Sequence, residues 1–358
     1  MRAVQYNAPE SLSLVDLDEP HAGDGQVVVE VATCGICGSD LHSYSHGIAA
    51  VPGQVLGHEF SGRVIEAPGV VGIAEGDRVT VRPLLPCGEC DRCREGALQL
   101  CESGHETNIG YGLRGAFAER VLVPSAIPGV TVFRLPDAIP DNGGALVEPL
   151  AVGLRVVRRA GDLAGTVTLV LGAGMIGLGA IRFAKLRNPK TLIVADPSPV
   201  RRAAAEALGA DITIDPLATK ITDVVREVTG PGGYGLGARA DVVIDCAGSP
   251  EAFAEGLKSV RHGGTMALTA MYNRKIEVNP SRIVEKELTI NGSFAYNDEF
   301  PMVIDAIERG DVDPALFVSH EYGLDEYEQA FRTQLDRDVS LKVLVTPYAN
   351  RGNAPAQP

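Results

Sequence analysis

The chain has 358 residues, of which 45% are hydrophobic and 22% are charged, and its formal net charge is −14 at pH 7. This composition is ordinary for a folded globular protein and excludes disorder as the main state, while the length favours two domains. An acidic chain without a basic stripe repels phosphate backbones and anionic lipid, so we expect no nucleic-acid partner and no membrane partner. No apolar run reaches the roughly 18 residues of a transmembrane helix, and no signal-peptide pattern opens the chain, so the expected compartment is the cytoplasm.

The first 150 residues predict a β-rich domain with long loops. Residues 26–33 form a β-branched run that is typical of a strand. Further short strands are predicted at 63–66 and 77–81, each bounded by Gly or Pro.

Two short motifs after the first strand supply side chains suited to a metal ion. The thiolate of Cys37, the imidazole of His58 and the carboxylate of Glu59 would converge from loops, as at a zinc ion that keeps a fourth position open. Cys34 and Cys37 alone could form a redox pair, and a lone His58 could be an ordinary buried histidine. A second zinc-type motif and a coenzyme motif further along the chain favour the metal site.

Four later cysteines have the spacing of a structural zinc site. Cys87, Cys90 and Cys93 are separated by two residues each, and Cys101 follows after seven more. This spacing lets a polar, turn-rich loop bring four thiolates to the corners of a tetrahedron, which leaves no position for substrate. Four unrelated thiols are the alternative, and an odd total of seven cysteines argues against a disulfide framework.

Glu148 is a carboxylate in an apolar run, between Val147 and Pro149. A buried carboxylate needs a metal ion or a charged partner, or else it takes up a proton. Glu148 is therefore a further candidate ligand, and an ordinary salt-bridged carboxylate is the alternative.

The pattern changes at about residue 152 to strands that alternate with helices. This alternation predicts βαβ units and a parallel sheet covered on both faces. Strands are predicted at 166–171, 191–195, 212–214, 241–245 and 264–270, and helices at 175–187, 199–209 and 250–260. A helix at 300–309 and a last strand at 340–346 follow.

A glycine motif at the end of the first of these strands predicts a dinucleotide site. Its glycines would permit a tight turn, a close approach to a pyrophosphate and close helix–strand packing. Asp196 ends the next strand and would accept hydrogen bonds from a ribose 2′-hydroxyl, which favours NAD over NADP, although Arg201 could accept a 2′-phosphate and Asp196 could be a simple strand-end cap. The motif comprises Gly172, Ala173, Gly174, Met175, Ile176 and Gly177.

Taken together, these motifs resemble those of the zinc-dependent medium-chain dehydrogenase/reductases, in particular the sorbitol and butanediol dehydrogenase branch. The resemblance covers nearly the whole chain. It implies an α/β plus β fold, in which a doubly wound parallel Rossmann sheet is inserted into a GroES-like, β-rich catalytic domain. The implied domains are a catalytic domain over 1–151 with a structural zinc lobe at 86–102, an NAD-binding domain over 152–292, and a return to the catalytic domain over 293–358.

The resemblance also implies how a catalytic zinc would be held. Cys37, His58 and a third acid would be its ligands. Glu148 matches the third position of this branch, and Glu59 could bind directly or through water. Asp40 resembles the residue that orients the ligands.

The implied reaction is hydride transfer between NAD(H) and a secondary alcohol, diol or polyol and its ketone, with one catalytic and one structural zinc. Ser39 resembles a hydroxyl relay at the substrate oxygen, and His42 resembles its solvent-side base, although His42 could be an ordinary surface histidine. Ala295 stands where sorbitol-type members commonly carry Arg, which favours a secondary alcohol or vicinal diol over a hexitol. A threonine-type or cyclitol dehydrogenase and a non-catalytic NAD-binding scaffold are the alternatives, and a homodimer or homotetramer is expected.

Overall fold

The computed structural model describes residues 1–104, 106–230, 238–272 and 274–348. Its contacts divide the chain into two compact units, each with a hydrophobic core of its own. The first unit comprises Met1–Glu148, Phe300–Asp336 and the segment that begins at Lys342, and the second comprises Pro149–Glu299 and Arg337–Leu341. Both ends of the chain therefore contribute to the first unit, and the second is an insertion.

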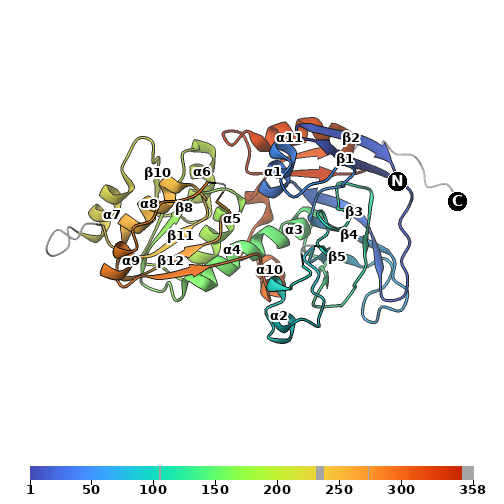
Figure 1. The fold of residues 1–358 in the computed structure, drawn as a ribbon, viewed down its shortest axis with the longest axis horizontal. Coiled ribbons are helices and arrows are strands. Elements are labelled where there is room, and N and C mark those ends of the chain that lie inside the picture. Colours follow the sequence, from blue (N-terminus) through green and yellow to red (C-terminus); the bar gives the residue numbers. More distant parts are fainter. Residues whose placement is uncertain (105, 231–237, 273, 349–358) are drawn as a thin grey trace. The chain divides into compact units, whose positions relative to one another are not determined.

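The first unit is built on β-structure (Figure 1). Its main sheet has seven strands, with β14-β15-β3-β4-β5-β7 in spatial order and β6 paired with β3, while β1 and β2 form a two-stranded sheet. The strands are β1 (Arg2–Ala8), β2 (Ser11–Asp16), β3 (Val27–Gly35), β4 (Glu59–Glu66), β5 (Arg78–Val81), β6 (Arg120–Val123), β7 (Val132–Arg134), β14 (Val318–Gly323) and β15 (Lys342–Thr346).

The central strand β3 brings a predicted ligand into this core. It is rich in valine, a β-branched residue that favours strands, and it is largely buried on both faces. Its last residue, Gly35, pairs with Glu59 on β4 and with Leu344 on β15. The side chain of Glu59 is therefore attached to a strand in the middle of the sheet.

The second unit contains one sheet of six parallel strands, in the spatial order β10-β9-β8-β11-β12-β13. Counted along the chain within this unit, the order is 3-2-1-4-5-6, which is that of a doubly wound dinucleotide-binding fold. The predicted α/β plus β fold is confirmed. The strands are β8 (Val167–Leu171), β9 (Thr191–Ala195), β10 (Ile212–Ile214), β11 (Ala240–Asp245), β12 (Val260–Leu268) and β13 (Thr289–Gly292).

Helices of the second unit connect its strands. Two of them begin at a serine whose hydroxyl accepts a backbone N–H, Ser198 from Arg201 and Ser249 from Ala252, and each serine precedes a proline at the first helical position. The α-helices described between residues 147 and 308 are α4 (Val147–Ala160), α5 (Met175–Lys185), α6 (Pro199–Ala207), α7 (Ile221–Thr229), α8 (Pro250–Ser259), α9 (Ser281–Glu285) and α10 (Glu299–Glu308).

Among the described residues, four α-helices of nine or more residues lie where the sequence predicts none. One is α4, whose Pro149 stands in its first turn, where proline is tolerated. Another is α1, which opens with residues of low helix propensity but is capped by Asp40, whose carboxylate accepts the N–H of Cys37. The others are α7 and α11. The first unit contains α1 (Gly38–His46), α2 (Asp91–Arg94), α3 (Asp141–Ala145), α11 (Tyr327–Leu335) and short 3₁₀ turns at Leu98–Leu100, Pro314–Leu316 and Leu324–Glu326.

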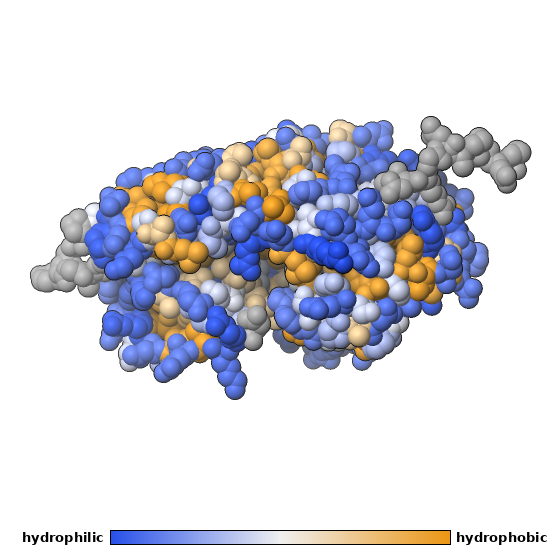
Figure 2. Space-filling view, turned by 90° about the horizontal axis from the view of Figure 1, so that it is seen from above, coloured by the Kyte–Doolittle hydropathy of each residue, from blue (hydrophilic) through white to orange (hydrophobic). Residues whose placement is uncertain are grey.

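Polar side chains cover most of the face shown in Figure 2, and apolar side chains gather there in separate patches. Among the large exposed apolar residues are Val71, Leu217 and Met271. Within the part of the chain that the structure describes, no helix is both long and apolar enough to cross a lipid bilayer.

Candidate active site

Three predicted ligands meet in the first unit. Cys37 is the N-cap of α1, His58 directly precedes β4, and Glu59 is the first residue of β4. One ligand atom from each of the three lies within 4.8 Å of the others. The expectation that all three come from loops is wrong, because a helix cap and a strand position the thiolate and the carboxylate. These elements hold the group more rigidly than loops would.

Asp40 holds two of these ligands in place. It is fully buried, and its Oδ2 accepts the N–H of Cys37 at 2.9 Å while its Oδ1 accepts that of Gly57 at 3.3 Å. The same Oδ1 lies 3.5 Å from Nδ1 of His58. With Nδ1 facing a carboxylate, Nε2 is the nitrogen left for a metal ion, as the predicted orienting role of Asp40 requires.

The charge of the Cys37–His58–Glu59 group fits a divalent cation. Burial alone would lower the pKa of His58, but the charge of Asp40 opposes it most strongly and Tyr111 and Cys37 add to this effect, so that the pKa stands well above its ordinary value. Oε1 of Glu59 is buried without a hydrogen-bond partner among the described residues. Such an oxygen is costly to bury unless a cation faces it, and a thiolate, an imidazole and a carboxylate are the donors that zinc prefers.

Lys342 is a further residue of this site, and no motif in the sequence points to it. Its ammonium group is buried, and it donates to Oε2 of Glu59 at 2.5 Å and to the carbonyl of Ile36 at 2.9 Å. Burial opposes the lysine charge, but the charges of Glu59 and Cys37, with the hydrogen bond to Glu59, together raise the pKa of Lys342. One oxygen of Glu59 is thus occupied by Lys342, and the other is left for a metal ion.

Glu148 lies outside the three-ligand group. It is buried in the first turn of α4, and its charge helps to raise the pKa of Lys342. The charges of both acids therefore act on Lys342, whereas only Glu59 has a ligand atom close to those of Cys37 and His58.

The four cysteines of the predicted lobe also meet. Their Sγ atoms all lie within 4.8 Å of one another. The Sγ of Cys87 accepts the N–H groups of Cys90 and Glu89 at 3.4 Å, and these hydrogen bonds lower the pKa of Cys87 to about 6. Sγ of Cys101 accepts the N–H of Cys87 at 3.2 Å. Amides that stabilise thiolates, around four convergent sulfurs, match a closed zinc site.

In the second unit, two glycines of the predicted motif are required by close packing. Gly172 has φ of +88°, and a Cβ there would lie 2.9 Å from Cα of Ala247. A Cβ on Gly177 would lie 2.0 Å from the carbonyl oxygen of Gly172. Gly174 caps α5, and a Cβ there would meet only Nη1 of Arg201, at 3.8 Å, which leaves room for a pyrophosphate to approach.

Asp196 and Arg201 lie beside this turn. Asp196 is buried, and its two oxygens accept the N–H groups of Ala173 at 2.7 Å and Ser198 at 2.8 Å. Burial lowers the pKa of Arg201, and its Nε has no hydrogen-bond partner among the described residues. Met175 and Ile176 open α5 and are half-buried. The carboxylate thus braces the glycine turn in addition to any contact with a ribose.

Comparison with known proteins identifies the family. Residues 23–137 match the model of the alcohol dehydrogenase GroES-like domain, and residues 176–309 match that of the zinc-binding dehydrogenases. The chain is 34% identical to L-threonine 3-dehydrogenase from Pyrococcus abyssi over 89% of this chain and 90% of that protein. It is 32% identical to (R,R)-butanediol dehydrogenase from Bacillus subtilis, over 97% and 100% of the two chains.

The chain belongs to the zinc-dependent medium-chain dehydrogenases. Solved structures of related proteins support this family assignment. A zinc-binding dehydrogenase from Sinorhizobium meliloti bound to NADP has a TM-score of 0.86 and 33% identity over 97% of this chain and 99% of that one. An alcohol dehydrogenase from Escherichia coli complexed with NADH has a TM-score of 0.88 and 29% identity over the same shares. This medium-chain dehydrogenase is therefore an enzyme, an oxidoreductase that acts on CH–OH groups of small molecules.

The two predicted relay residues of this medium-chain dehydrogenase stand on one helix. Ser39 lies in the first turn of α1 and is half-buried. His42 is exposed one turn later, with its ring centroid 6.1 Å from that of His46. Ser39 therefore stands at the start of α1, two residues after Cys37, and His42 lies at the surface.

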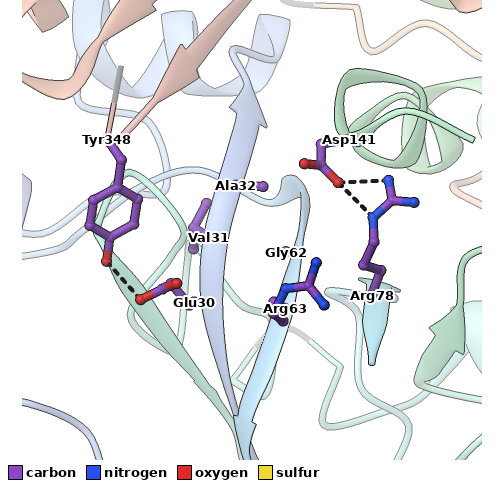
Figure 3. Close-up of a pocket in the computed structure, with 8 residues that line it drawn as sticks. All are labelled: Glu30, Val31, Ala32, Gly62, Arg63, Arg78, Asp141 and Tyr348. Carbon is purple, nitrogen blue, oxygen red and sulfur yellow. Dashed lines mark hydrogen bonds and ion pairs between the residues drawn. The ribbon is translucent and has the colours of Figure 1, made fainter. Parts of the chain in front are cut away.

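A cavity of about 300 Å³ in the first unit has no link to the predicted residues (Figure 3). Its charged side chains have partners of their own, because Arg78 and Asp141 form an ion pair at 2.7 Å and Tyr348 donates to Glu30 at 3.4 Å. The remaining charged group, Arg63, donates to the carbonyl of Gly76, so each of these side chains has a polar partner among the described residues. The cavity is lined by Glu30, Val31, Ala32, Gly62, Arg63, Arg78, Asp141 and Tyr348.

Proposed function

We propose that this chain oxidises a secondary alcohol or vicinal diol to its ketone, or catalyses the reverse reaction, with NAD(H) as the coenzyme. The observation that carries the proposal is the buried group of Cys37, His58 and Glu59, in a chain that also contains a braced dinucleotide-binding turn. The first provides the donors of a zinc site that keeps a position open, and the second provides a place for a coenzyme pyrophosphate.

Cys37, His58 and Glu59 would hold the catalytic zinc, with Glu148 as a nearby acid that could replace Glu59. A zinc ion bound there supplies a Lewis acid, which makes a coordinated hydroxyl more acidic. Asp40 fixes the orientation of His58, and Lys342 occupies one oxygen of Glu59. The four cysteines Cys87, Cys90, Cys93 and Cys101 would hold a second, structural zinc.

The proton released by the substrate hydroxyl needs a way out of the buried site. Ser39 would accept it at its hydroxyl oxygen and pass it toward His42, whose exposed ring exchanges protons with water. The position of both residues on α1 supports this order, because Ser39 is half-buried near Cys37 and His42 is at the surface.

For the coenzyme, we favour NAD over NADP. The buried carboxylate of Asp196 stands at the end of β9, where it would repel a 2′-phosphate and accept a hydrogen bond from a ribose hydroxyl. Arg201 would contact the same ribose, and the first turn of α5, with Gly174, Met175 and Ile176, would meet the pyrophosphate.

Two observations support the proposed substrate class, the residue at position 295 and the similarity to a butanediol dehydrogenase. Ala295 lacks the cation, suited to a sugar polyol, that sorbitol-type members commonly carry at this position, and the butanediol dehydrogenase of Bacillus subtilis matches nearly the whole chain.

A threonine-type activity is the second candidate, because the threonine dehydrogenase of Pyrococcus abyssi is similarly related. The test is NADH formation by the zinc-loaded protein with 2,3-butanediol, 2-butanol, sorbitol and L-threonine. Turnover confined to L-threonine would refute the diol proposal.

The domain limits follow the same proposal. We assign residues 1–151 and 293–358 to the catalytic domain, with the zinc lobe at 86–102, and residues 152–292 to coenzyme binding. We also propose a homodimer or homotetramer. Support comes from β13, which is the last strand in its sheet, and from the exposed side chains of Met271, Val284 and Phe294 in the same unit. Light scattering of the purified protein tests the assembly.

A further inference from the structure

Tyr111 lies in a turn that is fixed against the metal-binding group. The N–H groups of Tyr111 and Leu113 both donate to the carbonyl of Asn108, at 3.1 and 3.0 Å. Gly110 has φ of +94°, and a Cβ there would lie 2.9 Å from the carbonyl oxygen of Gly57 and 3.3 Å from Cβ of His58. Only glycine allows this approach, so the turn is seated directly on the residues that precede β4.

The side chain of Tyr111 extends from this turn to the candidate zinc ligands. Its ring centroid lies 5.4 Å from that of His58, with the ring planes inclined at 42°. Cys37 and Asp40 are close enough for their charges to act on its hydroxyl, and the hydroxyl of Ser39 approaches it as a potential hydrogen-bond partner. The tyrosine thus borders the same space as the metal group and the proposed relay.

The hydroxyl of Tyr111 is buried, and no described residue gives it a hydrogen bond of standard length and angle. An unsatisfied buried hydroxyl is costly, because it has lost its hydrogen bonds to water without replacing them. A protein that keeps such a group beside its reactive site can recover this cost when a ligand supplies the missing partner. A phenolic hydroxyl carries its proton at neutral pH, so Tyr111 can donate a hydrogen bond to an oxygen of the substrate.

We propose that the Tyr111 hydroxyl is a specificity determinant, which hydrogen-bonds a second hydroxyl on the carbon next to the reacting CH–OH group. The inference rests on the proposed function and narrows it to vicinal diols and their hydroxyketones. Ser39 serves the reacting oxygen in the relay, which leaves Tyr111 for the neighbouring oxygen. A site built to hydrogen-bond a substrate hydroxyl discriminates strongly against the analogue that lacks it.

The test compares Tyr111→Phe with the unaltered protein on 2,3-butanediol and 2-butanol, which differ by one hydroxyl. We expect kcat/KM for the diol to fall about 10- to 100-fold, mainly through KM, and kcat/KM for 2-butanol to change less than about threefold. Zinc per chain should stay unchanged, and the melting temperature should not fall, because phenylalanine fills the same space without the unsatisfied hydroxyl. Tyr44→Phe is the matched control, since that tyrosine packs on Phe331 and should leave both substrates unaffected.

Equal loss on the two alcohols, or no loss on the diol, would overturn the inference. A second readout is the shift in melting temperature that each alcohol causes in the zinc-loaded protein with NADH. We expect a larger shift from the diol, which Tyr111→Phe removes. If the unaltered protein oxidises neither alcohol, the proposed function fails, and the inference fails with it only if the diol also causes no larger shift than 2-butanol.

Discussion

A Cβ atom on Gly35 would lie only 2.3 Å from Oε2 of Glu59. Gly35 pairs with Glu59 across the sheet, and on its other side β15 brings Lys342 to within 3.3 Å of the same Cβ position. The ion pair between Lys342 and Glu59 therefore passes over the middle strand at the one residue without a side chain. The absence of a side chain at position 35 is thus a condition for the geometry of the Glu59 carboxylate.

Gly35→Ala should destabilise the protein by about 1–3 kcal/mol, because the new methyl group displaces the Glu59 carboxylate in a well-packed core. Urea unfolding measures this loss. Gly38→Ala is the matched control, since nothing lies within 4 Å of its added Cβ and alanine favours the helix α1 that begins there. Equal stability of the two variants would contradict the packing argument.

Lys342→Met should cost about 3–5 kcal/mol of unfolding free energy, since it leaves Glu59 as a buried charge without its partner. Removal of both charges in Lys342→Met/Glu59→Leu should recover much of this loss. Unfolding of the metal-free protein in urea separates this effect from zinc binding. A double variant no more stable than Lys342→Met would show that the pair is not the cause.

Cys93→Ser should reduce bound zinc from two ions per chain to one, because the lobe then has three thiolates in place of four. Metal analysis after dialysis measures the content. Cys246→Ser should keep two zinc ions, since Cys246 lies outside both ligand groups. A Cys93→Ser protein that retains both ions would remove the structural zinc from the account.

Ser39→Ala should keep zinc and NAD binding but lower kcat by about 10²–10⁴-fold, since it interrupts the proposed path of the proton. Steady-state kinetics with the best alcohol of the panel measures this change. Ser45→Ala on the same helix is the control and should leave kcat unchanged. Near-normal turnover by Ser39→Ala would discredit the relay.

Asp196→Asn should raise the ratio of kcat/KM with NADP to kcat/KM with NAD by at least about tenfold, because the charge that repels a 2′-phosphate is removed. Asp241→Asn is the control, since Asp241 accepts the N–H of Val167 at the start of β8, away from the strand ends that bind coenzyme. An unchanged ratio would mean that Asp196 only braces the N–H of Ala173.

The parts of the site that lie in short motifs could be predicted from the sequence. The four cysteines and the glycine turn are set by local spacing, and the structure brings each group together. Lys342 could not be found in this way, because it meets Glu59 across 283 positions of the chain and its own segment looks like any valine-rich strand. The helix α4 was missed for a similar reason, since Pro149 in its first turn looks like a helix breaker.

The strand β15, with Lys342 at its start, follows the strands of the inserted sheet along the chain. It pairs with β3, which precedes that sheet. During synthesis the Glu59 carboxylate is therefore made well before its lysine partner, and every strand of the inserted sheet is made between the two. The central strand of the first unit can acquire its neighbour β15 only after the whole of the inserted sheet has been synthesised.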